Sequence, residues 1–179
     1  MIEVEKKFQP TEEQLKVLLE GAEFLGEKIV HDIYYDYSDY RLLKKDVRLR
    51  NRNNFFELKV GKSSGVSQEI EKREDIEKYF STSNLGEFIQ KNLVVIIDYQ
   101  SKRQKYKKEN FSIDLDEMNF GYKLCEIELL VEKEEQVKDA ENKIIDFAQK
   151  YNFDFKRILS KRFEFLRKFK PEIYKELRK

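Results

Sequence analysis

Acidic and basic side chains recur at every second position in six short segments of this sequence. Because successive side chains of a β-strand point to opposite faces, residues two positions apart lie on the same face. Apolar residues occupy most of the positions between them. The six sets are Glu3, Glu5 and Lys7; Arg48, Arg50 and Arg52; Glu57 and Lys59; Glu69 and Glu71; Asp114 and Asp116; and Glu126 and Glu128.

These residue types suit a site that binds a phosphorylated anion together with a divalent cation. Arginine presents a planar fork that can bind two phosphate oxygens at once, and lysine adds a point charge. Mg²⁺ prefers carboxylate oxygens, water and substrate phosphates as ligands. An antiparallel sheet with one solvated face shows the same alternation, so any single strand of this kind is weak evidence. Six such strands carrying both signs of charge could instead line the inside of a closed sheet.

Most of the elements that must position these side chains are predicted to be strands. Asn53 and Asn54 form a good two-residue hairpin turn between two of them, because asparagine tolerates a positive φ. Thr11 is expected to cap a helix that starts after Pro10 and ends near Gly21. The alternation predicts strands over residues 2–8, 27–35, 46–52, 55–60, 66–72, 93–106, 111–116 and 124–131. The remaining patterns predict short helices within 74–91, an amphipathic helix over 134–150, a basic helix over 161–169 and a last helix after Pro171.

Composition excludes several classes of protein. The chain has 179 residues, of which 40% are charged and 40% hydrophobic, and we expect a single domain over residues 1–179. A net charge of +1 argues against a protein that coats nucleic acid. Cys125 and His31 are the only cysteine and histidine, which leaves no internal disulfide and no Cys- or His-rich metal site. An acidic start and the lack of an apolar run of about 18 residues predict a cytoplasmic protein without a membrane span.

The charged sets also carry a family resemblance that covers nearly the whole chain. Glu3-Val4-Glu5-Lys6-Lys7 matches the N-terminal E-x-E-x-K signature of the CYTH, or triphosphate tunnel metalloenzyme, superfamily. Tyr34-Tyr35-Asp36 and Phe120-Gly121-Tyr122 look most like its thiamine triphosphatase branch. The companions of the signature follow in family order: Arg50-x-Arg52, Glu57-Leu58-Lys59, Glu69-x-Glu71, Arg103, Asp114, Glu126-x-Glu128 and Lys161.

The resemblance implies a fold, an activity and a set of site residues. The implied fold is α+β, a closed eight-stranded antiparallel β-barrel with helices packed outside and the segment from about 156 to 179 closing or flanking the tunnel. The implied activity is hydrolysis of the terminal phosphate of a small triphosphate with Mg²⁺, for which Mn²⁺ could substitute. Substrate-binding positions carried over are Lys7, Arg50, Arg52, Lys59, Glu71, Arg103 and Lys161; metal positions are Glu3, Glu5, Asp114, Glu126 and Glu128; and catalytic positions are Glu5 with the dyad Tyr34 and Lys59.

One position departs from the thiamine triphosphatase pattern. Two residues before the first arginine of the R-x-R pair, where that branch carries a tryptophan, this chain has Arg48, and it contains no tryptophan. A cation at this place disfavours a cationic thiamine group, whose stacking on tryptophan would contribute on the order of 1 kcal/mol. The sequence therefore favours inorganic tripolyphosphate as the substrate and keeps thiamine triphosphate as the alternative, since the Arg48 guanidinium could itself stack.

Three other functions compete with hydrolysis of a triphosphate. A class IV adenylyl cyclase would use the same scaffold to make cyclic AMP from ATP. A polyphosphate-binding module without activity would need the bases but not so many carboxylates beside a polyanion. Nucleic-acid binding through the basic C-terminal segment is the least supported of the three. Its affinity would fall steeply as the salt concentration rises. We expect a monomer whose partner is a small polyanion.

Overall fold

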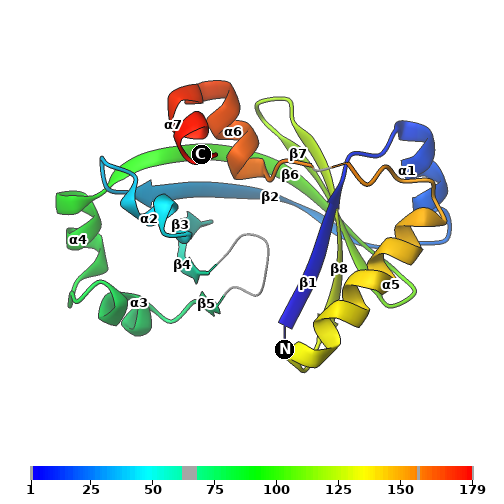
Figure 1. The fold of residues 1–179 in the computed structure, drawn as a ribbon, viewed down its shortest axis with the longest axis horizontal. Coiled ribbons are helices and arrows are strands. Elements are labelled where there is room, and N and C mark those ends of the chain that lie inside the picture. Colours follow the sequence, from blue (N-terminus) through cyan, green and yellow to red (C-terminus); the bar gives the residue numbers. More distant parts are fainter. Residues whose placement is uncertain (1, 62–67, 157, 179) are drawn as a thin grey trace. The chain divides into compact units, whose positions relative to one another are not determined.

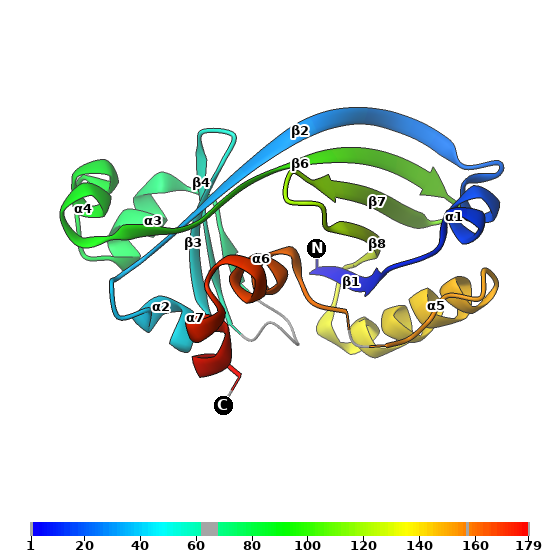
Figure 2. The same ribbon diagram turned by 90° about the horizontal axis from the view of Figure 1, so that it is seen from above.

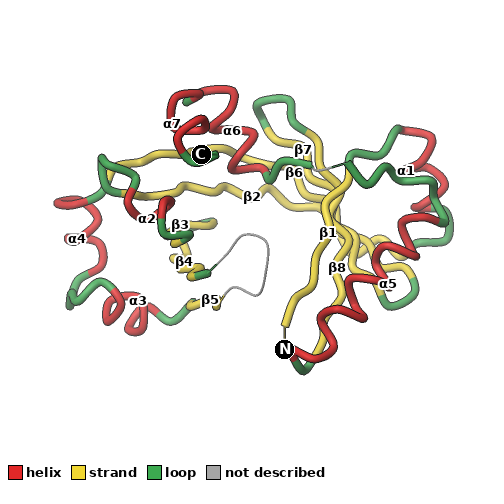
Figure 3. The backbone as a smooth tube through the Cα atoms, in the orientation of Figure 1, coloured by secondary structure: helices red, strands yellow, loops and turns green. Residues whose placement is uncertain are grey.

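The fold centres on one antiparallel sheet of eight strands, seen in a computed structural model that describes residues 2–61, 68–156 and 158–178 (Figures 1 and 3). The strands pair in the order β1-β8-β7-β6-β2-β3-β4-β5. Their bounds are β1 Ile2–Phe8, β2 Glu23–Asp36, β3 Val47–Arg52, β4 Phe55–Val60, β5 Gln68–Ile70, β6 Val94–Lys108, β7 Phe111–Met118 and β8 Lys123–Val131. This confirms the eight strands and the accompanying helices, and closure into a barrel stays a prediction.

The registers bring the alternating charged residues of neighbouring strands together. Between β1 and β8, Glu5 lies opposite Glu128 and Lys7 opposite Glu126. Asp114 on β7 lies opposite Glu126 on one side and Lys105 on the other. Because directly opposed residues have their side chains on the same face, the charged positions of four strands form one continuous surface.

The chain divides into two compact units, each with its own hydrophobic core. The first comprises Met1–Ile29 with Ser101–Glu164. On the face of its sheet opposite the charged surface, β1 and β8 pack against α5 (Val137–Gln149), which follows the short 3-10 helix η1 (Glu134–Gln136) (Figure 2). This core buries Val4, Phe8, Leu18, Phe111, Ile113, Cys125, Ile127, Ala140, Ile144, Phe147, Ala148 and Phe153.

The helix ends of the first unit follow from local sequence. Helix α1 (Glu12–Leu19) begins at the predicted cap, where the Thr11 hydroxyl accepts from the Gln14 amide and the Gln14 side chain accepts from the Thr11 amide. This reciprocal pairing satisfies two backbone donors that a helix start leaves open. The amphipathic helix α5 buries Ala140, Ile144, Phe147 and Ala148.

The second unit comprises Val30–Gln100 with Phe165–Lys179. Its core buries Leu42, Val47, Leu49, Leu58, Ile76, Leu85, Ile89 and Leu93 beneath helices α2 (Arg41–Lys44), α3 (Arg73–Tyr79) and α4 (Leu85–Asn92). Asn53 and Asn54 join β3 to β4 with φ of 48° and 72°, as the hairpin prediction requires. The predicted start of β5 at residues 66 and 67 lies outside the described residues.

One helix was not expected from the sequence, and the C-terminal helices lie where the sequence predicted them. The short helix α2 was not predicted; it is held by the buried Asp36 carboxylate, which accepts hydrogen bonds from the amides of Leu42 and Leu43 at 2.9 Å each. The basic segment forms α6 (Lys161–Phe169) as predicted, and α7 (Pro171–Glu176) follows it. Among the described residues, no helix is both long and apolar enough to cross a membrane.

Candidate functional site

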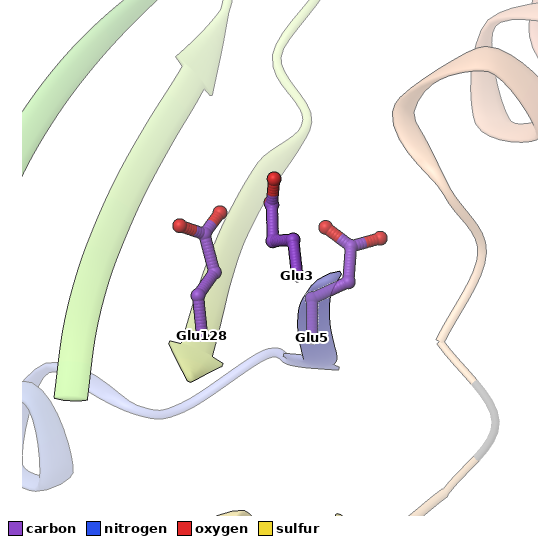
Figure 4. A group of neighbouring side chains, drawn as sticks. All are labelled: Glu3, Glu5 and Glu128. Carbon is purple, nitrogen blue, oxygen red and sulfur yellow. The ribbon is translucent and has the colours of Figure 1, made fainter. Parts of the chain in front are cut away.

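The first unit carries a surface that we call the acidic face, made by the charged residues of four adjacent strands. Glu3, Glu5 and Glu128 have carboxylate oxygens that all lie within 4.8 Å of one another, and Figure 4 shows the three side chains rising on the same side of β1 and β8. A second trio with the same spacing comprises Asp114, Glu126 and Glu128. The acidic face comprises Glu3, Glu5, Lys7, Arg103, Lys105, Asp114, Asp116, Glu126 and Glu128.

The second trio fits a hard divalent cation. Asp114 is fully buried, and neither of its carboxylate oxygens accepts a hydrogen bond of normal geometry from a described residue. Arg103 Nη1 approaches one of those oxygens at 2.5 Å as an ion pair. Buried carboxylates normally have hydrogen-bond partners or coordinate a metal. The oxygen-only ligand set therefore matches what Mg²⁺ or Mn²⁺ would use.

Four basic side chains lie close to these carboxylates, and one of them is Lys105, whose ammonium is 3.6 Å from Asp114 Oδ1. Lys7 contacts Glu5 and approaches Glu126 at 3.6 Å. Arg103 binds Asp116 through two hydrogen bonds of 2.9 and 2.8 Å. Lys161, the first residue of α6, is buried, with its ammonium 2.6 Å from Glu126.

The two glutamates of β8 have opposite electrostatic environments although only Ile127 separates them. Burial would raise the pKa of Glu126, but Lys161, Lys7 and Arg103 outweigh it and lower that pKa to about 2. Burial, together with the neighbouring carboxylates of Asp114, Glu3 and Glu126, raises the pKa of Glu128 to about 8. Glu128, which belongs to both trios, therefore has the more negative environment of the two glutamates.

The second unit carries a surface that we call the arginine face, made by one face of β2, β3, β4 and β5. Arg50 and Arg52 lie on β3, and each is bound through its Nε by a carboxylate of a neighbouring strand. Arg50 Nε donates to Glu57 at 2.6 Å, and Arg52 Nε donates to Asp32 at 2.7 Å. Lys59 approaches Glu69 at 3.1 Å. The arginine face comprises Asp32, Tyr34, Arg48, Arg50, Arg52, Glu57, Lys59 and Glu69.

Tyr34 is buried behind Arg50 on the arginine face. It hydrogen-bonds to Arg50 and to Tyr99, which is buried behind it on β6. Burial alone would raise the pKa of the Tyr34 phenol, but the positive charges of Arg50 and Arg52 outweigh it and lower that pKa. Arginine is thus the cation that hydrogen-bonds to Tyr34 here, and the dyad of Tyr34 with Lys59 stays a prediction.

The structure brings most of the sequence-predicted site residues into these two surfaces. Glu3, Glu5, Lys7, Arg103, Asp114, Glu126, Glu128 and Lys161 gather at the acidic face, and Tyr34, Arg50, Arg52 and Lys59 belong to the arginine face. Glu71 follows the end of β5 and is exposed. Its neighbour Glu69 is the carboxylate that contacts Lys59 and approaches Arg50 at 3.5 Å.

Sequence reasoning left out three residues that belong to these surfaces or contact them. Asp32 lies two positions before Tyr34 on the same strand face, an alternation that could have revealed it. The alternation grouped Asp116 with Asp114 but did not assign it to the site, although it is only 2% exposed and binds Arg103 and Lys161. Nothing in the sequence pointed to Tyr99, because its partner Tyr34 lies on another strand 65 positions away.

Comparison with known proteins places these surfaces in a family context. The sequence profile of the CYTH domain family matches residues 1–159. Human thiamine-triphosphatase is 27% identical over 207 aligned positions, which cover 99% of this chain and 89% of the human protein. The Macaca fascicularis thiamine-triphosphatase matches at the same identity and coverage.

Solved structures share the same fold. A Pyrococcus horikoshii protein superposes with a TM-score of 0.61 at 26% identity, covering 85% of this chain and 91% of its own. A Hippeastrum protein described as a putative adenylyl cyclase with a dominant triphosphatase activity superposes with a TM-score of 0.60 at 19% identity, covering 92% and 94%. A putative adenylate cyclase from Vibrio parahaemolyticus gives 0.66 at 16% identity, covering 93% and 98%.

Proposed function

Because the chain belongs to the CYTH domain family, we propose that it is a Mg²⁺-dependent hydrolase that removes the terminal phosphate of a small triphosphate, with inorganic tripolyphosphate as its preferred substrate. The observation that carries the proposal is the acidic face, where two carboxylate trios share Glu128 and lie in contact with basic side chains. A module that only bound polyphosphate would lose affinity by holding so many carboxylates beside its ligand. A bound divalent cation would offset their charge and polarise a phosphoryl oxygen.

The residues divide by chemistry into two roles. Lys7 and Arg103 of the acidic face and Lys161 of α6 are proposed to bind phosphate oxygens, and so are Arg50, Arg52 and Lys59 of the arginine face. Phosphoryl transfer depends mainly on positioning and on neutralising charge, which arginine forks and lysines provide. Glu3, Glu5, Asp114, Glu126 and Glu128 are proposed to hold one or two Mg²⁺ or Mn²⁺ ions, and Glu5 is proposed to take part in catalysis as well. The closed eight-stranded barrel belongs to the same proposal.

The preference for tripolyphosphate rests on the arginine face. Arg48 adds a cation beside Arg50, and its Nη2 donates to the Gly61 carbonyl at 3.3 Å. A bare polyanion gains from every additional cation, whereas the positively charged thiamine group is repelled by it. The relatives named thiamine-triphosphatase keep thiamine triphosphate as the second candidate substrate.

Phosphate release from a panel of substrates tests the proposal. Tripolyphosphate, thiamine triphosphate, ATP and long-chain polyphosphate are each incubated with Mg²⁺, with Mn²⁺ and with EDTA. We expect metal-dependent release with the highest kcat/KM for tripolyphosphate. A higher kcat/KM for thiamine triphosphate would keep the enzyme class and refute the substrate preference. Cyclic AMP formed from ATP with Mn²⁺ would identify a cyclase, and binding of polyphosphate without any release would identify a binding module.

A further inference from the structure

Asp32 stands out on the arginine face as a buried carboxylate that binds the Arg52 guanidinium with both of its oxygens. It is 1% exposed, and its two oxygens accept from Arg52 Nε at 2.7 Å and from Arg52 Nη2 at 3.0 Å. The β2–β3 register places Asp32 directly opposite Arg52. The contact is therefore built into the pairing of two strands and does not depend on a flexible surface side chain.

The geometry of this pair leaves the other side of the guanidinium available. Asp32 occupies the edge formed by Nε and Nη2, so the Nη1 hydrogens and one Nη2 hydrogen of Arg52 point away from it. A guanidinium held on one edge by a carboxylate loses rotational freedom before any ligand arrives. Holding a binding group in advance lowers the entropic cost of binding.

The same arrangement recurs in the first unit. Asp116, 2% exposed, binds the Nε and Nη2 edge of Arg103 at 2.9 and 2.8 Å. The opposite side of that guanidinium, Nη1, points at Asp114 of the second carboxylate trio. Asp116 thus holds the Arg103 guanidinium so that its remaining donors point toward the candidate metal ligands. We assign the same role to Asp32 for Arg52.

We propose that Asp32 is a positioning residue, which holds the Arg52 guanidinium by its Nε–Nη2 edge so that its remaining donors bind a phosphate of the substrate. The inference deepens the proposed function and rests on it, because it takes the ligand of Arg52 to be a triphosphate. It also accounts for a buried carboxylate among the cations of a surface meant for an anion. The Asp32 charge offsets the repulsion between Arg50 and Arg52, which are two residues apart on β3.

A double-mutant cycle on tripolyphosphate binding, measured by calorimetry with EDTA present, tests the inference. We expect Asp32→Asn to weaken binding by roughly tenfold, since the amide keeps one acceptor but loses the second hydrogen bond and the charge. Arg52→Ala should weaken binding further, and Asp32→Asn should no longer weaken binding in the Arg52→Ala background. Asp98→Asn is the matched control. Asp98 is an exposed carboxylate of β6 that pairs with His31, the neighbour of Asp32 on β2.

A second readout follows the guanidinium itself. The Nε–Hε NMR signal of Arg52, assigned by its absence from Arg52→Lys, should be shifted and protected from exchange in the wild type and lose both properties in Asp32→Asn. Tighter binding by Asp32→Asn would overturn the inference, because Asp32 would then compete with the ligand for Arg52. An equal effect of Asp32→Asn with and without Arg52 would also overturn it.

The outcomes separate this inference from the proposed function. If the wild-type protein binds tripolyphosphate but releases no phosphate with any metal, the proposed hydrolase is wrong while the cycle still decides the role of Asp32. If the wild type binds no tripolyphosphate at all, both fail. Thermal unfolding of each variant shows whether a weakened affinity reflects a folded protein.

Discussion

Lys161 at the start of α6 and Glu126 in the middle of β8 form a buried ion pair, with 2.6 Å between the lysine Nζ and the glutamate Oε2. The same ammonium contacts Asp116 on β7. A lysine from a basic, helical stretch of sequence is therefore the counterion of two carboxylates on the acidic face. This pair links the C-terminal helical segment to the strands that carry the candidate metal ligands.

Replacing Lys161 by methionine should destabilise the protein and abolish its activity. Removing one partner of a buried pair leaves an uncompensated charge, which typically costs about 3 kcal/mol of unfolding free energy. We expect a loss of this size in urea unfolding followed by circular dichroism. Lys168→Met is the control, because Lys168 lies on the same helix and is exposed. Unchanged stability of Lys161→Met would show that the pair contributes nothing to the fold.

The same ion pair predicts a loss of stability in acid. The pKa of Glu126 is lowered to about 2 in the folded protein, against an ordinary value of 4.5. A carboxyl with a lowered pKa contributes stability that is present above its unfolded pKa and is lost as the pH falls toward its folded pKa. The free energy of unfolding should therefore drop between about pH 4.5 and pH 2, and Glu126→Gln should show a smaller drop over that range.

The raised pKa of Glu128 predicts that metal binding releases a proton at neutral pH. Its pKa is raised to about 8 by burial and by neighbouring carboxylates, so the carboxyl is mostly protonated at pH 7 without a metal. A raised pKa contributes stability present below the unfolded value of 4.5 and lost as the pH rises through about 8. Metal-free protein should thus lose stability between pH 4.5 and 8, and Mn²⁺ affinity should rise over pH 7 to 9.

Calorimetry in buffers of different ionisation enthalpy measures the proton release directly. The apparent enthalpy of Mn²⁺ binding at pH 7 should vary with the buffer in proportion to the protons released. Glu128→Gln should bind Mn²⁺ weakly and without this dependence. Mn²⁺ affinity that stays constant from pH 7 to 9 would contradict the prediction.

The carboxylate trios predict which substitutions abolish turnover without harming the fold. Glu5→Gln and Glu128→Gln each remove one proposed cation ligand and keep the size of the side chain. We expect phosphate release to fall at least a hundredfold in both, with unchanged circular dichroism. Glu12→Gln, at an exposed position of α1, is the matched control. Near-normal turnover by both site variants would refute the metal assignment.

Replacing Arg48 by tryptophan should change the substrate preference. Arg48→Trp removes a cation that attracts a bare polyanion and adds an aromatic surface on which a thiamine ring can stack, worth on the order of 1 kcal/mol. The ratio of kcat/KM for thiamine triphosphate to that for tripolyphosphate should rise about fivefold or more. Arg48→Ala separates the two causes, since it removes the cation without adding the ring. A ratio that falls in Arg48→Trp would refute the proposed role of Arg48.

Local sequence determined much of the fold and most of the candidate site. Strict alternation revealed eight strands, because one face of each strand must pack against apolar neighbours while the other carries charge. The Asn53-Asn54 turn and the Thr11 cap could be read from the residues, since each depends on backbone geometry within a few positions. The motif order, starting at Glu3-x-Glu5-x-Lys7, predicted which of the charged residues belong to the proposed site.

Tertiary structure decided how those charges pair. Glu69, rather than Glu71, contacts Lys59, because the β4–β5 register places Glu69 opposite it. Asp32 became a partner of Arg52 only through the β2–β3 register. Ion pairing depends on separations of a few ångströms between residues far apart in sequence, and strand registers and helix placement set those separations. The sequence by itself therefore specified which side chains share a face, whereas the fold specified which carboxylate holds which base.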